Sequence, residues 1–337
     1  DADWDIWDSH RDMILRDRVI HDNMLTFTEM NTFGKKGIGN ESTYNAGYAL
    51  ATYIANEYGP EVLRDIFDEL SSPLQFSVNT AIKNVLGVSG QDVYMNFKSA
   101  SEARYKRLVV PIEVMPVQGD LLQTNGTTNI HPKWNPKENS YIYLSNKNND
   151  YFGQTDLYYH DLDSNEETKI KSSVLSAPTW HSNGRMIYYS KKSKYPNKYG
   201  SRYYDIYSFD LDTEEEERLT IDARAFSPVF IEDDSSIAYL ATYDGGQDIY
   251  KLDLRSNISK KLTDFKDRPM ISHLNYNAGT QQIYFDITKH HHRDIYSYDL
   301  SNKTINKIES SDSFDERNMS ANLSGLGVYS KDQSGIY

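Results

Sequence analysis

Apolar residues near the N-terminus recur at steps of three and four, which is the spacing of one helical face. The clearest run comprises Tyr44, Tyr48, Ala51, Ala55 and Tyr58. Gly59 then supplies a stop, and Pro60 suits the first turn of the next helix. Ser89, followed three residues later by Asp92, resembles a capping box that starts another helix. The pattern predicts a helical segment over residues 1–107, with these apolar side chains packed in its core.

The pattern changes after Arg107. Val109 to Leu122 includes two prolines and predicts an extended connector, so we place a linker at residues 108–128. Beyond it the segment Asp-(Ile/Leu)-Tyr-x-x-Asp-Leu occurs four times. Its copies begin at Asp156, Asp205, Asp248 and Asp294. Four copies at so even a spacing indicate an internal repeat.

Each copy lies in a larger unit of roughly 45 residues, with a β-rich run before it and a further strand after it. The first strand of each unit carries an apolar landmark: Trp134, Trp180, Phe230 and Leu274. Four strands per unit are typical of a β-propeller blade. We expect the two Asp residues of each copy to accept backbone N–H bonds in turns at the strand ends. The predicted fold class is therefore α+β and multidomain, a helical segment followed by an all-β propeller.

The propeller is expected to occupy residues 129–337 and to be incomplete, with four full blades and part of a fifth. The fifth unit begins at Met319, and Gly335 replaces the first Asp of its repeat. The chain starts at Asp1 without an initiator Met and stops within a repeat. We therefore interpret it as a fragment of a larger protein.

Charge and composition narrow the partner classes. The chain has 36 basic and 49 acidic residues, a net charge of −13, which disfavours nucleic acid and anionic membrane surfaces. No apolar run approaches the ~20 residues that a transmembrane helix needs. The absence of cysteine excludes disulfides, thiolate nucleophiles and cysteine zinc sites within these residues. A protein or peptide is the partner class that we expect.

The loops between the second and third strands of the blades should open on the same side as the connections between blades. In this sequence they are rich in aromatic and basic residues, whereas the turns on the opposite side are rich in acidic ones. Loops on a rigid scaffold often carry recognition, and Tyr and Arg are favoured at binding hot spots. The candidate binding residues are Tyr151, Phe152, Tyr195, Lys198, Tyr199, Arg202 and Tyr203.

Two stretches resemble known families. Ala177-Pro178-Thr179-Trp180-His181-Ser182-Asn183-Gly184 and Gln247-Asp248-Ile249-Tyr250 resemble the repeats of TolB-like β-propellers, over roughly residues 129–337. Asn40 to Tyr48, Tyr53-Ile54 and Tyr58-Gly59 resemble the region after the zinc site of gluzincin-type (peptidase MA clan) domains. In bacterial proteins of that kind, the peptidase-like domain precedes a TolB-like propeller. The resemblance implies an exported protein, in the periplasm or at the cell surface.

The chain departs from gluzincins at the catalytic motif. Zinc in these peptidases is held by a His-Glu-x-x-His helix, and none of the nine histidines lies in such a motif. We therefore assign no catalytic residue, metal ligand or cofactor here: either the zinc site of such a peptidase lies upstream of residue 1, or the larger protein lacks it. His290-His291-His292 is interpreted as a solvated loop, since adjacent strand residues point to opposite faces. No Gly-x-Ser-x-Gly nucleophile motif is present either.

Three functions stay open at this point. The first is a propeller that binds a protein or peptide. The second is a propeller that gates or positions substrate for a zinc metallopeptidase domain lying upstream. The third is a carbohydrate-binding propeller, because exposed tyrosines can stack on pyranose rings. Whether the larger protein is an enzyme is left undecided by these residues.

Overall fold

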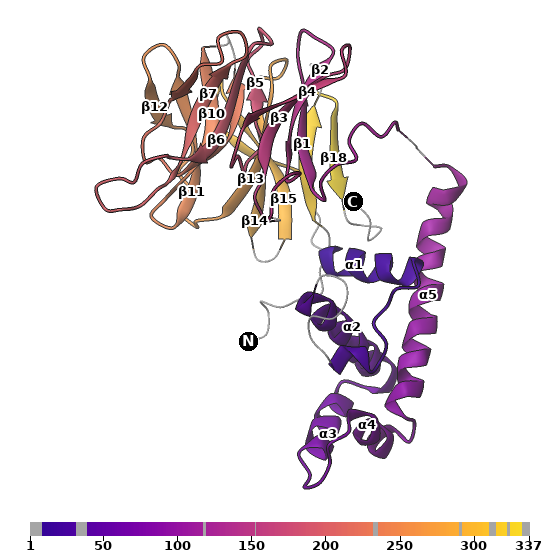
Figure 1. Cartoon of the computed structure of the whole chain (residues 1–337). Helices are drawn as coiled ribbons and strands as arrows, with labels where there is room; N and C mark the ends of the chain where they lie inside the picture. The colour runs from indigo at the N-terminus through magenta and orange to yellow at the C-terminus, as the bar shows by residue number, and fades with distance from the viewer. Residues whose placement is uncertain are drawn as a thin grey trace. The chain divides into compact units, whose positions relative to one another are not determined.

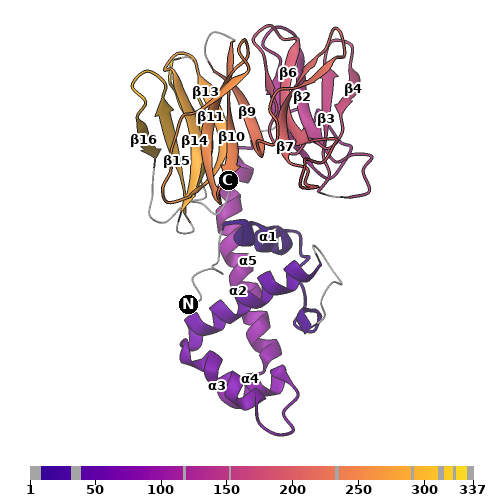
Figure 2. The same ribbon diagram turned by 90° about the vertical axis from the view of Figure 1, so that its left-hand side faces the viewer.

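The computed structural model describes residues 9–31, 39–116, 119–151, 153–231, 235–289, 292–309, 315–321 and 324–331. The chain divides into two compact units, a helical one within Asp1–Gly119 and a β-rich one within Asp120–Gln333 (Figures 1 and 2). This confirms the predicted class, a helical part followed by an all-β propeller.

The helical unit is built from short helices around one apolar core. The elements are α1 (Ser9–Ile20), the 3-10 turn η1 (Glu29–Asn31), α2 (Asn40–Tyr58), α3 (Glu61–Leu70), α4 (Val78–Leu86) and α5 (Gly90–Val114). Ile54 of α2, Ile82 of α4 and Phe97 of α5 are among the buried residues that meet in the core. None of the helices in the described ranges is both long enough and apolar enough to span a membrane.

The face that α2 buries differs from the predicted one. Tyr44 and Tyr58, on the predicted face, are 58% and 36% exposed. The buried apolar side chains are instead Ala46, Ala49, Leu50 and Ile54. Both faces satisfy the helical spacing, but small alanines allow the neighbouring helices to approach closely, whereas a tyrosine hydroxyl favours contact with water.

Glycine or serine marks three helix ends, of which the stop at Gly59 and the start at Ser89 were predicted. Gly59 follows α2 with φ 98°, and Gly87 follows α4 in the left-handed region with φ 73°, where glycine has no steric cost. At the start of α5, the Ser89 Oγ accepts the Asp92 N–H at 3.1 Å and donates to the Asp92 carboxylate at 2.6 Å. The predicted N-cap at Ser89 is therefore confirmed, with the Asp92 carboxylate bonded to the Ser89 hydroxyl.

Helix α5 extends further than the sequence suggested. Val109 was expected to open an extended connector, but the helix runs through Val114 and contains Pro111. Tyr105 and Leu108 continue the apolar stripe of α5 into the core, which favours helix beyond Arg107. Pro111 removes only one N–H from the helix, and the helix ends about one turn later.

Removing the Ser89 cap gives a first testable prediction. Ser89→Ala is expected to lower the free energy of unfolding of the helical unit by about 1 kcal/mol, because the Asp92 N–H loses its acceptor. Urea denaturation followed by far-UV circular dichroism measures this change. Ser89→Thr keeps the hydroxyl and should lose much less, so equal losses in the two variants would contradict the cap.

The β-rich unit consists of antiparallel sheets in which consecutive strands are neighbours. The first sheet contains β1 (Asn129–Trp134), β2 (Ser140–Ser145), β3 (Asp156–Asp161) and β4 (Glu166–Lys171), and the second contains β5 (Thr179–Trp180), β6 (Met186–Lys192), β7 (Tyr204–Asp210) and β8 (Glu216–Arg218). The third contains β9 (Ala225–Ile231), β10 (Ser236–Tyr243), β11 (Gly246–Asp253) and β12 (Ile258–Lys261), and the fourth contains β13 (Met270–Asn277), β14 (Gln282–Lys289), β15 (His292–Asp299) and β16 (Ile305–Glu309).

A pair of strands, β17 (Glu316–Ala321) and β18 (Gly327–Lys331), follows the fourth sheet. The four four-stranded sheets are the four predicted blades, and the pair corresponds to the start of the fifth repeat. The predicted copy of the motif at Gly335 lies outside the described residues.

The hydrophobic core of the propeller lies between the faces of successive blades. One buried cluster joins Leu144 of blade 1 to Ile187 of blade 2. A second joins Ile206 of blade 2 to Tyr239 of blade 3, and a third joins Leu240 of blade 3 to blade 4. Each blade is thus stabilised mainly by its neighbours, as repeat architectures require.

The second Asp of each repeat closes the turn between the third and fourth strands. Asp210 Oδ1 accepts the N–H groups of Asp212 at 2.8 Å and Thr213 at 3.2 Å. The same pair of bonds recurs at Asp161, Asp253 and Asp299. These contacts confirm the expected role of that Asp in a turn.

The first Asp of each repeat contacts residues further along the chain. Its carboxylate pairs with a basic residue on the fourth strand: Asp156 with Lys169, Asp205 with Arg218, Asp248 with Lys261 and Asp294 with Lys307. In the first three blades it also accepts an N–H from the connection to the next blade, such as that of Ala223 at 2.9 Å from Asp205. This Asp therefore ties a blade to the chain that leaves it.

Candidate functional site

A β-bulge recurs in the first strand of several blades. The register of β1 with β2 shifts between Ile130 and Lys133, and β9, β13 and β17 show equivalent shifts. At each shift one residue has positive φ: His131, Ser227, His273 and Asn318. Such bulges redirect side chains and are common near functional sites.

Three of these bulge residues line one cavity of about 640 Å³. Its walls come from blades 1 to 4 and from the loop between β6 and β7. The lining residues are His131, Leu175, Ser176, Ala177, Ser190, Lys192, Arg202, Tyr203, Tyr204, Arg224, Phe226, Ser227, Thr242, Ser272 and His273. We call this cavity the channel pocket. Its volume falls within the range of small-ligand sites.

The rim of the channel pocket is basic. Lys192, Arg202 and Arg224 are exposed and line it, and no described lining residue is Asp or Glu. The Arg224 guanidinium lies 4.4 Å from the Tyr203 ring centroid and donates to the Tyr203 hydroxyl at 3.0 Å. That hydrogen bond lowers the pKa of Tyr203. The Lys192 ammonium lies 5.7 Å from the centroid of the Tyr204 ring. The arrangement suits the binding of an anionic group.

Two histidines from opposite ends of the repeat array meet in the channel pocket. The ring centroids of His131 and His273 are 6.2 Å apart. The His273 Nδ1 donates to the carboxylate of the fully buried Asp286 at 2.9 Å. Burial, with smaller effects from His273 and Lys133, lowers the pKa of His131 from 6.5 to about 4. His131 is therefore neutral at physiological pH.

The predicted binding residues fall into separate groups. Arg202 and Tyr203 lie in the channel pocket. Tyr195 and Tyr199, on the same loop, are 70% and 78% exposed and are not among the lining residues. Lys198 lies over the Tyr199 ring, with 4.8 Å between its Nζ and the ring centroid.

The remaining two predicted residues belong to the loop of blade 1. Tyr151 is 72% exposed and does not line the channel pocket. Phe152 lies outside the described residues.

The loop between β6 and β7 is held by its own hydrogen bonds. The Asn197 side-chain oxygen accepts the N–H groups of Tyr199 at 2.9 Å and Ser201 at 3.1 Å. The Asn197 N–H donates to the Ser201 carbonyl at 2.7 Å, and the Ser193 N–H to the Tyr203 carbonyl at 2.9 Å. The loop therefore presents its tyrosines from a fixed turn.

Sequence reasoning missed Lys192, Arg224, His131 and His273. Lys192 belongs to β6, and Arg224 lies in the connection between blades 2 and 3. The predicted binding residues all came from loops between second and third strands. A signal did exist: His131, Ala177 and Ser227 each precede a proline, within β1, just before β5 and within β9. Aligning the repeats on that proline would have placed these three residues around one channel.

Of the histidine run, the structure describes His292, which is the first residue of β15 and pairs with Lys289 of β14. His290 and His291 lie outside the described residues. Within the described ranges, no group of three or more His, Asp or Glu side chains is placed to hold a metal ion.

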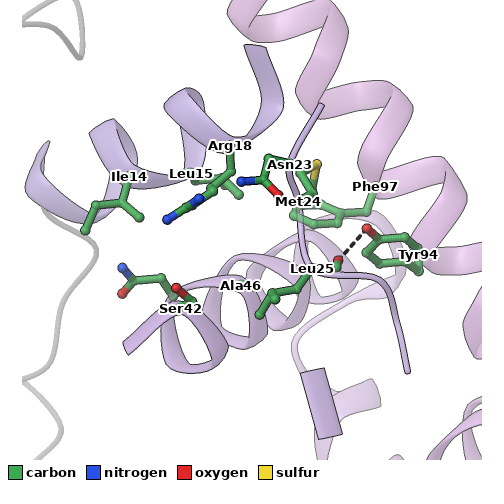
Figure 3. Close-up of a pocket in the computed structure, with 11 residues that line it drawn as sticks. Ile14, Leu15, Arg18, Asn23, Met24, Leu25, Ser42, Ala46, Tyr94 and Phe97 are labelled. Atoms are coloured by element: carbon green, nitrogen blue, oxygen red, sulfur yellow. Dashed lines mark hydrogen bonds between the residues drawn. The ribbon is translucent and has the colours of Figure 1, made fainter. Parts of the chain in front are cut away.

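A second cavity lies in the helical unit (Figure 3). Leu15 of α1, Ala46 of α2 and Phe97 of α5 line it, and the Tyr94 hydroxyl beside it donates to the Leu25 carbonyl at 2.6 Å. Its volume of about 20 Å³ is close to the space that one water molecule needs. The channel pocket is therefore the better candidate for a ligand.

Known proteins resemble the propeller in fold. No family model and no curated protein matches the chain. Among solved structures, TolB from Acinetobacter baumannii is 20% identical with a TM-score of 0.44, over 56% of this chain and 45% of that chain. A structure assigned as TolB from Agrobacterium tumefaciens is 17% identical with a TM-score of 0.49, over 59% and 68%. A puromycin-hydrolyzing peptidase from Mycobacterium tuberculosis is 12% identical with a TM-score of 0.44, over 63% and 34%.

These similarities concern the fold. The match spans less than half of the Acinetobacter TolB chain. The β-propeller resembles that of TolB, as the sequence repeats suggested. The resemblance of the helical unit to gluzincin-type domains stays a prediction.

Proposed function

We propose that this propeller is a binding module for a protein or peptide. The observation that carries the proposal is the channel pocket, a cavity of about 640 Å³ that opens beside the loop between β6 and β7. Its rim is basic and partly aromatic, and Leu175, Phe226 and the alanine at 177 give it apolar walls. Concave sites with apolar walls and a few polar groups are the usual form of ligand sites.

The neighbouring loop extends the proposed surface. Tyr195 and Tyr199 are 70% and 78% exposed, above the intermediate burial that is typical of tyrosine. Tyrosine loses little conformational entropy on binding and is enriched at interfaces. A partner that enters the channel pocket beside Arg202 can contact the same loop, since Tyr199 is three residues from Arg202.

The proposal includes an exported location, in the periplasm or at the cell surface of a bacterium. It rests on the resemblance to TolB-like propellers. The absence of cysteine is compatible with that location. Gating of an upstream zinc peptidase domain is the alternative role that the resemblance implies for the larger protein.

A selection from a random peptide library displayed on phage tests the binding role. The full chain should enrich a set of related peptides. The variant Tyr195→Ala, Tyr199→Ala, Arg202→Ala should lose at least about tenfold in affinity for them, because it removes two aromatic anchors and a rim cation. The matched control is Asp163→Ala, Glu166→Ala, Glu214→Ala; Asp163 and Glu214 lie in turns between third and fourth strands, and Glu166 begins β4. No enrichment, or equal losses in both variants, would contradict the proposal.

A further inference from the structure

We propose that the channel pocket receives an acidic peptide segment, with an apolar side chain in the cavity and carboxylates at its basic rim. This inference rests on the proposed function and adds the chemistry of the ligand. Three features of the described residues support it. The cations of the pocket lack carboxylate partners, two of them lie against aromatic rings, and the lining of the pocket has a particular composition.

The first feature is the lack of counter-ions. Lys192, Arg202 and Arg224 have no carboxylate within 4 Å among the described residues, and all three line one cavity that has no acidic side chain in its described lining. By contrast Lys191, next to Lys192, lies 2.7 Å from the Glu216 carboxylate. In a chain with 49 acidic and 36 basic residues, three cations without acidic partners around one cavity stand out. An incoming carboxylate would supply the missing counter-charge.

The second feature is how the cations are held. The Arg224 guanidinium lies over the Tyr203 ring at 4.4 Å, and within the described ranges only its bond to the Tyr203 hydroxyl uses a side-chain donor. Lys192 lies over Tyr204 at 5.7 Å and donates to no carboxylate in the part of the chain that the structure describes. An arginine has five N–H donors, so Arg224 keeps most of them for a ligand. Contact with an aromatic face orients a cation without neutralising it.

The third feature separates a peptide from a sugar. Among the described lining residues there is no Asp, Glu, Asn or Gln, and the polar side chains are hydroxyls, imidazoles and cations. Sugar hydroxyls are donors as well as acceptors, and the carboxylates and amides that best accept from them are missing. Leu175, which is 52% exposed, and Phe226 instead offer apolar contact. The walls therefore favour an apolar side chain of a peptide over a pyranose.

Isothermal titration calorimetry of the full chain tests the inference. The probes are three capped peptides, Glu-Glu-Phe-Glu-Glu, Gln-Gln-Phe-Gln-Gln and Lys-Lys-Phe-Lys-Lys, together with a short oligouronate. We expect the acidic peptide to bind at least about tenfold more tightly than the neutral one and the basic peptide to bind least. Added salt should weaken the acidic peptide most.

The test variant is Lys192→Gln, Arg202→Gln, Arg224→Gln. It should bind the acidic peptide at least about tenfold more weakly than the wild type and no more tightly than the neutral peptide. The control Lys83→Gln, Lys106→Gln, Lys260→Gln removes three exposed cations elsewhere and should bind like the wild type. Arg202→Gln alone repeats the test at an exposed position with no acidic partner among the described residues, so its result does not depend on whether the triple variant folds.

The outcomes separate this inference from the proposed function. Equal affinity for the acidic and neutral peptides would overturn the inference and leave peptide binding intact. Equal losses in the test and control variants would overturn it too, since net charge alone would then explain the preference. Binding of the oligouronate without the peptides would overturn both and favour a sugar ligand, and binding of no probe, with no peptide enriched from the library, would also reject both.

Discussion

Asp205→Ala is expected to lower the free energy of unfolding of the propeller by about 3–5 kcal/mol, because one buried carboxylate is the acceptor for several donors. The Asp205 side chain is completely buried. It accepts from Arg218 at 2.6 Å and from the Thr220 hydroxyl at 2.9 Å. It also accepts the N–H groups of Asp222 and Ala223.

Alanine would leave those donors without their acceptor in the connection between blades 2 and 3. Each buried donor that loses its partner costs about 1–3 kcal/mol. The loss also reaches beyond blade 2, because the chain held by Asp205 leads directly into Ala225, a buried residue of the cluster shared with blade 3. We therefore expect less cooperative unfolding as well as lower stability.

The matched control is Asp210→Ala, which changes the second Asp of the same repeat. Asp210 accepts two turn N–H groups near the surface, so its loss should cost only about 1 kcal/mol. Urea denaturation followed by tyrosine fluorescence compares the two variants. A loss at Asp205 no larger than at Asp210 would show that the first Asp is not a structural tie.

The second large effect is a loss of propeller stability in acid that depends on His131. Burial lowers the pKa of His131 from 6.5 to about 4. Between these two values the imidazole is protonated in the unfolded chain but neutral in the folded one, so acid favours unfolding. Stability from this group is fully present above pH 6.5 and is lost as pH falls towards 4. The loss should reach about 2 kcal/mol, allowing for screening at a partly exposed site.

The informative variant is His131→Asn. Asn tolerates the positive φ of 55° at this position, and Asn318 occupies the equivalent bulge in β17. Urea denaturation between pH 4 and 7 should show a shallower pH dependence for His131→Asn than for the wild type. His21→Asn, at an exposed position in the helical unit, should leave the pH dependence of propeller unfolding unchanged. Identical slopes for the wild type and His131→Asn would exclude a buried neutral His131.

Much of the fold could be predicted because it depends on short, repeated spacings. The copies at Asp156, Asp205, Asp248 and Asp294 marked the third strand of each blade. The alternation of strands and turns around them gave the four-stranded sheets. The cap at Ser89 was also local. These features depend on residues within a few positions of one another, so the local sequence pattern is enough to predict them.

The features that depend on packing could not be predicted in the same way. Helix α2 has apolar residues on more than one face, and only contact with α1 and α5 selects Leu50 and Ile54 over the tyrosines. The ion pairs of the first Asp could, however, have been predicted from the sequence. A basic residue lies thirteen positions after it in every blade, as Arg218 follows Asp205.

The candidate site was found only in part for a similar reason. Arg202 and Tyr203 were identified because they share one loop. Lys192, Arg224 and His273 come from three other places in the chain, and the ring of blades brings them together. A site whose residues come from several blades has no contiguous sequence motif by which it could be predicted.

A crystal structure of the full chain with a peptide from the phage selection tests the central claim most directly. The account predicts peptide density in the channel pocket, with an apolar side chain against Phe226 and a carboxylate within hydrogen-bonding distance of Arg202 or Arg224. Peptide bound instead at the acidic turns around Asp163 and Glu214, with the channel pocket empty, would contradict it.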